Sequence, residues 1–258
     1  MNLRNFINIK LMLMMGMVVI SFPSCTGVLG GLYDEVSTEM QPGFNNVRPD
    51  NTGTIYIDAT SYTQWHYIDI ESQTISIEEL PVPEYLPDNK EQVSQNSVQN
   101  LNSDKPSGVP ENWQFAIHRY DCKTNGGAAC ETEFTDIRTF IQSINKEGIQ
   151  KYDFVEDVKA SDPQKLQDEN ELGKIVVDMS HMMDGWLGYA SSDINLVVGR
   201  WLDVNKSQMP PIYTPSGKVY VIKMSDGTYG AIQLRDFKSK KNIKGVMTID
   251  YAWPLDLD

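Results

Sequence analysis

The chain is built from short segments in which hydrophobic and polar residues alternate, with turn residues between them. The clearest pair is 219–224 and 229–235, which flank Asp226 and Gly227. Alternation with a period of two is typical of a strand that buries one face. Asp-Gly is typical of a two-residue hairpin turn, whose central residues both have positive φ. The pattern therefore predicts an antiparallel hairpin.

Similar patterns predict further strands elsewhere, over 54–59, 65–70, 74–80, 114–120, 174–179, 195–203 and 245–253. Apolar residues at helical spacing predict one short helix within 134–144. Two polar stretches carry neither pattern: 81–111, which we expect to be a long surface loop, and 153–170, expected to be irregular or loosely helical. Many short strands and few helices indicate an all-β, antiparallel fold.

The N-terminus has the features of an export signal over residues 1–24. Arg4 and Lys10 precede an apolar run that is too short to be a comfortable permanent membrane span. Cys25 follows at once, which indicates a bacterial lipoprotein whose mature chain begins at a lipid-bearing cysteine; the alternative is an ordinary signal with an incidental cysteine. We expect 25–50 to be a flexible lipidated tether and 51–258 a single β domain, with structure beginning near Gly53.

Charge and motifs exclude several classes of function. The formal net charge is −13, whereas nucleic-acid binding needs clustered Lys and Arg. The chain lacks a Gly-x-Ser-x-Gly elbow, a phosphate loop, a His-Glu-x-x-His motif and a dinucleotide fingerprint. Only three histidines are present, which is few for a hydrolase built on imidazole bases. We therefore expect a binding protein rather than an enzyme.

Two cysteines remain outside the signal segment, Cys122 and Cys130. Disulfides persist in exported proteins, and the flexible, glycine-containing sequence between the two residues could bring the sulfurs together. We predict a disulfide. The alternative, a metal site, lacks a second Cys or His pair.

Soft and imidazole donors gather in one segment, 178–186. Met179, His181, Met182 and Met183 lie there, in a chain that has seven methionines outside its first 24 residues. Thioether and imidazole side chains bind haem iron and soft metals. The alternative is that these methionines fill gaps in an irregular apolar core.

Several motifs of this sequence resemble the HmuY family, a group of exported haem-binding lipoproteins of the Bacteroidetes. The most specific is the Ala-x-His-Arg-Tyr-Asp element at 116–121. The other matching segments are 57–62 with Trp65 and Tyr67, 113–115, 124–127, 201–203 with Tyr213, 219–223 with 226–227, and 245–251. The resemblance covers most of the chain from about residue 53, but 81–111 and 145–172 match poorly.

The resemblance implies an all-β, hand-like fold that holds haem. It also implies a hemophore role, in which the protein takes haem from host haem proteins and passes it to a TonB-dependent receptor of the outer membrane. The protein would then sit on the cell surface at the outer membrane, held by its lipid anchor alone.

Members of the family hold the iron with two axial side chains, either two histidines or two methionines. One position of the bis-histidine pattern falls here on or near Lys206, which cannot ligate while protonated, and Met209 is the nearest donor. The other position falls in the methionine cluster. The resemblance thus predicts a bis-methionine site formed by Met182 and Met209. The substitutes for Met182 are Met183 and Met179, and then His181.

Aromatic residues flank both ligand segments. Trp186, Trp201 and Tyr213 could line the faces of the porphyrin, although ordinary packing is the alternative. His118 lies inside the Ala-x-His-Arg-Tyr-Asp element and is expected to be buried and hydrogen-bonded. His66 is expected to be structural or exposed.

A second function remains open on the sequence alone. A β-fold surface lipoprotein could grip glycans or a partner protein through exposed aromatic residues, with the methionines in its core. The Soret band of bound haem distinguishes the two possibilities.

Overall fold

The computed structural model describes residues 41–80, 84–87, 109–160, 162–166, 173–205, 207 and 212–257. These belong to one compact unit, Asp34–Asp258. The expected signal segment 1–24, Cys25, Lys206 and Met209 lie outside the described residues.

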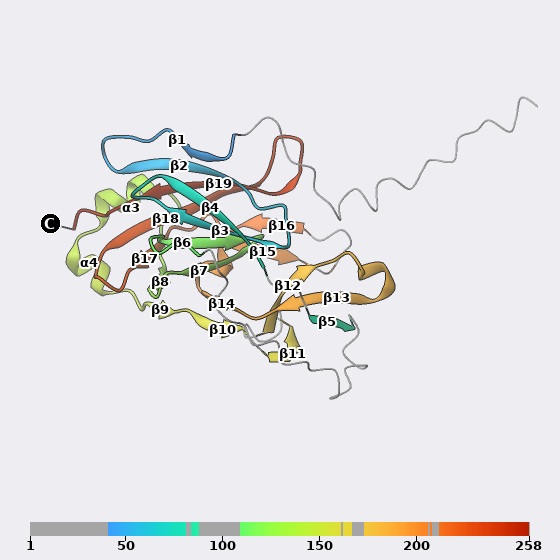
Figure 1. Cartoon of the computed structure of the whole chain (residues 1–258). Helices are drawn as coiled ribbons and strands as arrows, with labels where there is room; N and C mark the ends of the chain where they lie inside the picture. The colour runs from blue at the N-terminus through green and yellow to red at the C-terminus, as the bar shows by residue number, and fades with distance from the viewer. Residues whose placement is uncertain are drawn as a thin grey trace, which may run out of the picture. The chain divides into compact units, whose positions relative to one another are not determined.

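Most strands form two antiparallel sheets, which confirms the all-β prediction (Figure 1). The seven-stranded sheet has the order β1 (Gly43–Asn45), β2 (Thr52–Asp58), β19 (Lys244–Ala252), β18 (Tyr229–Lys238), β17 (Tyr220–Lys223), β8 (Ala128–Glu131), β9 (Val155–Glu156). The four-stranded sheet has the order β4 (Thr74–Glu79), β3 (Gln64–Asp69), β6 (Phe115–His118), β7 (Asp121–Thr124).

Three smaller sheets accompany them. One has the order β11 (Asp162–Leu166), β12 (Gly173–Asp178), β13 (Trp186–Ala190), β5 (Glu84–Pro87). Two others are the pairs β10 (Val158–Ala160) with β14 (Ser192–Ile194), and β15 (Leu202–Asn205) with β16 (Ile212–Pro215). The pairing of β11 with β12 is parallel, an exception to the antiparallel prediction.

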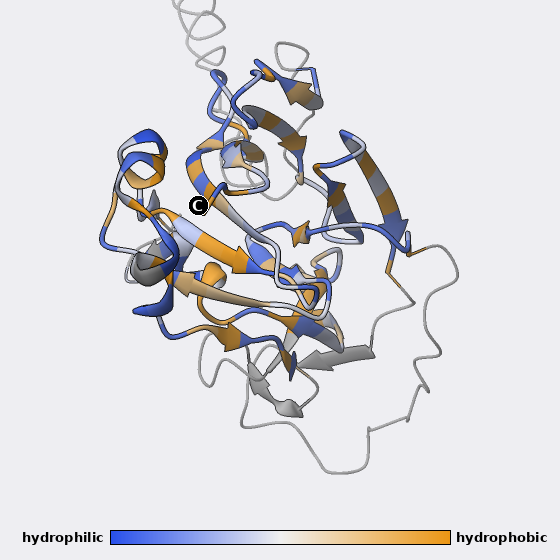
Figure 2. Ribbon diagram, turned by 90° about the vertical axis from the view of Figure 1, so that its left-hand side faces the viewer, coloured by the Kyte–Doolittle hydropathy of each residue, from blue (hydrophilic) through white to orange (hydrophobic). Residues whose placement is uncertain are grey.

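The main core lies between the two larger sheets. Ile55 and Ile222 of the seven-stranded sheet pack in one buried cluster with Ile68 and Phe115 of the four-stranded sheet. Figure 2 shows hydrophobic and hydrophilic residues alternating along several strands. This alternation sends successive side chains to opposite faces of a sheet, so each sheet presents one apolar face to the core.

The second face of the seven-stranded sheet is covered by two short helices. Val221 of β17 points away from the main core and packs with Phe140 of α3 (Ile137–Ser143) and Ile149 of α4 (Lys146–Gln150). The helix expected within 134–144 is confirmed as α3, and its N-cap Asp136 accepts a hydrogen bond from the amide of Thr139. No helix in the described part of the chain is long and apolar enough to cross a bilayer.

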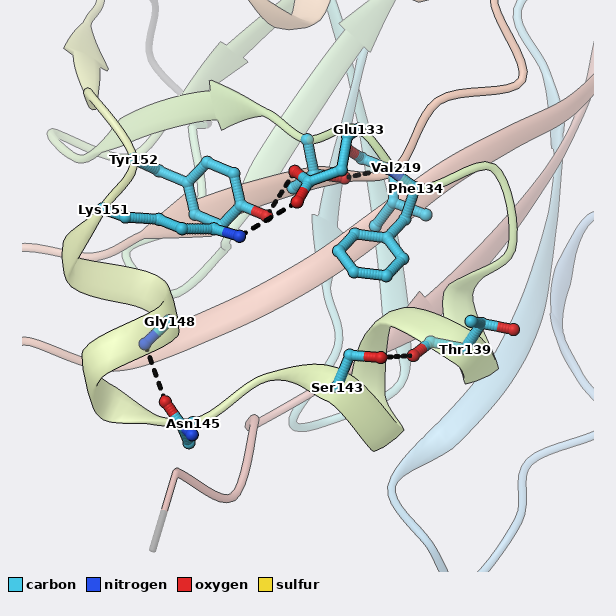
Figure 3. A network of polar contacts seen from close by, with 10 residues as sticks. Glu133, Phe134, Thr139, Ser143, Asn145, Gly148, Lys151, Tyr152 and Val219 are labelled. Carbon is cyan, nitrogen blue, oxygen red and sulfur yellow. Dashed lines mark hydrogen bonds and ion pairs between the residues drawn. The ribbon is translucent and has the colours of Figure 1, made fainter.

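A polar network fastens α4 to the end of β8 (Figure 3). Glu133 accepts hydrogen bonds from the Tyr152 hydroxyl at 2.6 Å and from Lys151 Nζ at 2.9 Å. These bonds hold the pKa of Glu133 at about 2. Asn145 caps α4 by accepting from the amide of Gly148 at 2.7 Å. The network is exposed, so it orients the helix more than it stabilises the fold.

Several expected boundaries differ from the structure. Among the described residues, regular structure begins at β1, within the stretch expected to be tether, because β1 extends the seven-stranded sheet by pairing with β2. β5 lies within the expected loop 81–111, and β9, β10 and β11 occupy much of 153–170. These strands are polar or very short, and pairing with a neighbouring strand defines them, so alternation could not reveal them.

Two further predictions were wrong in detail. The strand expected over 195–203 begins instead with the 3-10 helix η3 (Val198–Trp201), which leads into β15. The turn at Asp226-Gly227 is a three-residue loop closed between Met224 and Thr228, in which Gly227 has a φ of 90° and Asp226 keeps an ordinary φ. A single left-handed glycine is sufficient for this loop type.

The predicted disulfide is absent, because Cys122 and Cys130 are both free and buried. Cys122 on β7 packs in the core between the two larger sheets. Cys130 on β8 stands opposite Val221 in the register and packs with it on the other face of the seven-stranded sheet. The two sulfurs thus belong to different cores.

Candidate functional site

The segment rich in methionine forms the tip of a hairpin. We call residues 179–185, which join β12 to β13, the methionine loop. It contains the 3-10 helix η2 (Met182–Asp184) and ends at Gly185, whose φ of 80° requires a residue that tolerates the left-handed region. Backbone hydrogen bonds run from the amide of Met182 to the carbonyl of Met179 and from the amide of Trp186 to the carbonyl of His181.

The donors of the loop differ in exposure. The Met183 side chain is 73% exposed, and His181 is also exposed. Met179 and Met182 are partly buried, because they pack against Leu187 and Tyr189 of β13. The alternative that the methionines fill a core therefore fits Met179 and Met182 in part, and it does not fit Met183.

The strands beneath the loop carry packed apolar side chains on both faces. Ile175 and Val177 of β12 pack with Ala190 of β13 and with Trp65 of the four-stranded sheet. On the other face, Val176 packs with Leu187 and Tyr189. β13 also pairs with β5 along its other edge. The hairpin that carries the loop therefore packs on the rest of the fold through one face and pairs with β5 along one edge.

The charges at the loop are sparse. His181 Nδ1 lies 3.7 Å from a carboxylate oxygen of Asp184, and both side chains are largely exposed. Trp186, the first residue of β13, has 45% of its surface exposed. Thioether, imidazole and indole groups thus share one exposed turn, a set suited to an aromatic ligand that carries a soft or borderline metal.

The second predicted ligand segment joins β15 to β16, and Met209 within it lies outside the described residues. Figure 1 draws this hairpin and the methionine loop on the right of the view, away from α3 and α4 on the left. Tyr213 of β16 is half-buried, and its ring stacks on Phe237 at 5.3 Å with Lys244 Nζ 4.8 Å from its centroid. Only part of this ring is open to a ligand.

The structure corrects the expectation for Trp201. Its side chain is 0% exposed and lies in the main core. The indole nitrogen donates a hydrogen bond to the carbonyl oxygen of Tyr120 at 3.0 Å. Trp201 therefore anchors η3 and presents no surface to a ligand in this structure. Of the three aromatic candidates, Trp186 is the most accessible.

The two remaining histidines are structural, as expected. His118 is buried, with Nδ1 3.0 Å from an Asp121 oxygen and Nε2 2.6 Å from the carbonyl oxygen of Tyr62. These contacts join β6 and β7 to the loop before β3. His66 is buried on β3, and its burial lowers its pKa.

A lysine on β7 lies among aromatic rings, and nothing in the sequence indicates it. Lys123 Nζ on β7 donates a hydrogen bond to the Tyr67 hydroxyl at 3.0 Å and lies 4.2 Å from the centroid of the Trp65 ring. The centroid of the Trp113 ring lies further from Lys123 Nζ, at 5.9 Å. Burial lowers the pKa of Lys123 to about 8. No sequence signal points to this cluster, because only sheet register brings the rings together.

Metal binding by hard or mixed ligands has no support in the described residues, where no group of three or more His, Cys, Asp or Glu is placed to hold an ion. The methionine loop therefore remains the strongest candidate for a functional site.

Several solved structures are similar to this chain. The chain is similar to a HmuY-like protein of Bacteroides vulgatus described as haem-binding, with 38% identity, a TM-score of 0.64, and coverage of 84% of this chain and 100% of that one. A protein of Bacteroides fragilis described as a lipoprotein is 33% identical, with a TM-score of 0.65 and coverage of 86% and 100%.

An apo HmuY analogue of Tannerella forsythia shares the fold, with 22% identity, a TM-score of 0.58, and coverage of 80% and 97%. No functionally curated protein matches the chain. The sequence model of the HmuY family matches residues 61–251, a span that includes the four-stranded sheet, the methionine loop and the hairpin of β15 and β16. The chain therefore belongs to the HmuY family.

Proposed function

We propose that this protein binds haem through two axial thioethers, Met182 and Met209, and delivers it to a TonB-dependent outer-membrane receptor. The observation that carries the proposal is the methionine loop, which holds soft donors at the tip of a hairpin, next to the exposed Trp186 of β13. A relative that is 38% identical is described as haem-binding.

Met182 and Trp186 have distinct roles in this proposal. Met182 would supply the axial sulfur, since its partial burial against Leu187 and Tyr189 restrains the side chain. Trp186 would cover part of one porphyrin face through its exposed indole. Haem, when bound, supplies an iron centre with two axial positions, and the protein supplies donors and an apolar surface.

The cellular part of the proposal rests on the sequence and on the family. Cys25 would carry the lipid that holds the protein at the outer-membrane surface. Host haem proteins would be the donors, and the receptor the acceptor. The alternative, a surface protein that binds glycans or a partner without haem, has no specific observation in its favour.

Haem titration of the purified protein tests the proposal. We expect a Soret band with low-spin visible bands in the wild type and their loss or shift in Met182→Leu and Met209→Leu. Leucine preserves the volume and removes the sulfur, so packing is largely retained. Met224→Leu is the matched control, because Met224 packs beside the main core and not at the loop.

The oxidation state of the iron gives a second readout. Soft sulfur favours ferrous over ferric iron, so we expect tighter binding after reduction with dithionite. If the wild type gives no Soret band in either state, the haem proposal is wrong. If both leucine variants keep the wild-type spectrum, the ligand assignment is wrong although haem binding stands.

A further inference from the structure

The exposure of the methionines suggests how they would respond to an oxidant. Met183 is 73% exposed, Met179 and Met182 are partly buried, and Met247 in the main core is 0% exposed. A peroxide must reach the sulfur before it can react, so oxidation follows access. The methionine side chains therefore range from largely exposed to fully buried.

Consecutive residues of η2 face different surroundings. Met182 packs against Leu187 and Tyr189, whereas its neighbour Met183 extends into solvent. A 3-10 helix has about three residues per turn, so adjacent side chains point in different directions. The sulfoxide oxygen of an oxidised Met183 would remain exposed to solvent. Oxygen added to Met182 would place a polar S=O group against an apolar surface, which is unfavourable without a hydrogen-bond partner.

We propose that the methionine loop is a modification site for peroxides, at which oxidation of Met182 to the sulfoxide loosens the loop and abolishes haem binding. The proposal rests on the proposed function for its haem readout. The Met182 sulfur attacks one oxygen of hydrogen peroxide, and the O–O bond breaks as the S–O bond forms. The hydroxide that leaves takes the proton of the new S–OH group, which gives water and the sulfoxide. Methionine loses two electrons and the peroxide gains them.

The consequence for haem follows from the chemistry of the donor. A sulfoxide replaces the soft thioether lone pair with a harder oxygen and makes the side chain polar. Met183, by contrast, lies outside the packed part of the loop, so its sulfoxide should leave the loop unchanged. Methionine sulfoxide reductases reverse the modification, which makes it a switch rather than damage alone.

A time course with hydrogen peroxide tests the inference on the full chain without haem. Peptide mass mapping follows each methionine, including Met209, and haem titration follows binding at each time. We expect Met183 to oxidise first, Met182 and Met179 next, and Met247 last. Haem binding should fall in step with the Met182 sulfoxide and return after treatment with sulfoxide reductases. Met183→Leu should remain as sensitive as the wild type.

A second measurement does not depend on haem. Hydrogen exchange at the amides of Gly185 and Trp186, which close the loop onto Met182 and His181, should quicken when Met182 is oxidised. The inference is overturned if exchange is unchanged in protein whose Met182 is fully oxidised. It is also overturned if haem binding persists in that protein, or if binding falls with Met209 while Met182 remains a thioether. If untreated protein binds no haem, the proposed function and the haem part of this inference fail, and the exchange experiment decides the effect on the loop.

Discussion

At the scale of single residues, the described histidines divide into buried and exposed ones. His118 satisfies the carbonyl of Tyr62 and a carboxylate oxygen of Asp121 inside the protein, whereas His181 is 55% exposed. The same residue type therefore serves the fold at one position and is open to solvent at the other.

Replacing His118 should destabilise the protein. His118→Phe keeps a ring but removes two hydrogen bonds and leaves the Tyr62 carbonyl without this donor. We expect a loss of about 1–3 kcal/mol in the free energy of unfolding. Urea denaturation measures it, with His181→Phe as the control at an exposed site. An equal effect of both substitutions would contradict the structural role of His118.

Lys123 should make stability depend on pH. Burial lowers its pKa to about 8 in the folded protein, from 10.5 in the unfolded chain. Between pH 8 and 10.5 the unfolded state therefore binds more protons at this residue, and the stability that Lys123 contributes rises with pH. We expect the stability of wild type relative to Lys123→Met to increase across this window.

Urea denaturation at several pH values measures this difference. Comparing each variant with wild type cancels the titration of groups that do not interact with the substituted lysine. Lys240→Met is the control, because Lys240 is exposed. It shows how the loss of an ordinary surface lysine changes the free energy of unfolding. A wild-type advantage that stays constant or falls from pH 8 to 10.5 would refute the lowered pKa of Lys123.

At the scale of elements, close packing between the C-terminal segment and β18 depends on one glycine. A Cβ atom on Gly230 would overlap the ring of Trp253, which packs in the main core. Trp253 follows β19, and its backbone amide donates to the carbonyl of Asn51. Neither the ring nor the strand can therefore move aside easily.

Gly230→Ala should destabilise the protein by about 1–3 kcal/mol or more, because a methyl group forced into a packed site strains its neighbours. The thermal unfolding midpoint measures the effect. Gly199→Ala is the matched control: it lies in η3, and a Cβ there would meet open space. A tolerated Gly230→Ala variant would show that the Trp253 ring can repack.

At the scale of the whole molecule, the cysteines show how the sheets divide the interior. Cys122 and Cys130 lie in separate apolar clusters on opposite faces of the seven-stranded sheet. Burial raises the pKa of Cys130 to about 12 and that of Cys122 well above its usual value. Both features make the thiols unreactive in the folded protein.

We expect neither thiol to react with a disulfide reagent at pH 8 in the native state, and both to react after denaturation. A Cys25→Ser variant removes the third cysteine from the count. Colorimetric thiol titration measures both states. Recovery of no thiols in denaturant would show a disulfide and would overturn the separation of the two cores.

Local patterns were sufficient for some parts of the structure. The alternation in residues 54–59 and 245–253 anticipated β2 and β19, because these strands bury one face in the main core. Helical spacing likewise anticipated α3. The donors of the methionine loop and the buried His118 were also visible in the sequence, since an unusual side chain needs no partner to be noticed.

Other features depended on strand pairing and tertiary packing, which local patterns do not reveal. β1, β5 and β9 to β11 form through pairing with neighbouring strands, and a short or polar segment carries little signal of its own. Trp201 seemed suited to a ligand from its position beside the ligand segment, yet tertiary packing buries it. Likewise, nothing in the residues between Cys122 and Cys130 indicates the sheet faces they occupy.

The sequence by itself determined the class of the fold, the family and the donor types, because side-chain chemistry and local periodicity are properties of short segments. Only the tertiary structure decided which donors are exposed, which aromatic rings are buried and which rings surround Lys123. Those outcomes follow from sheet register and from the packing of one sheet on another, which join residues that no local pattern relates.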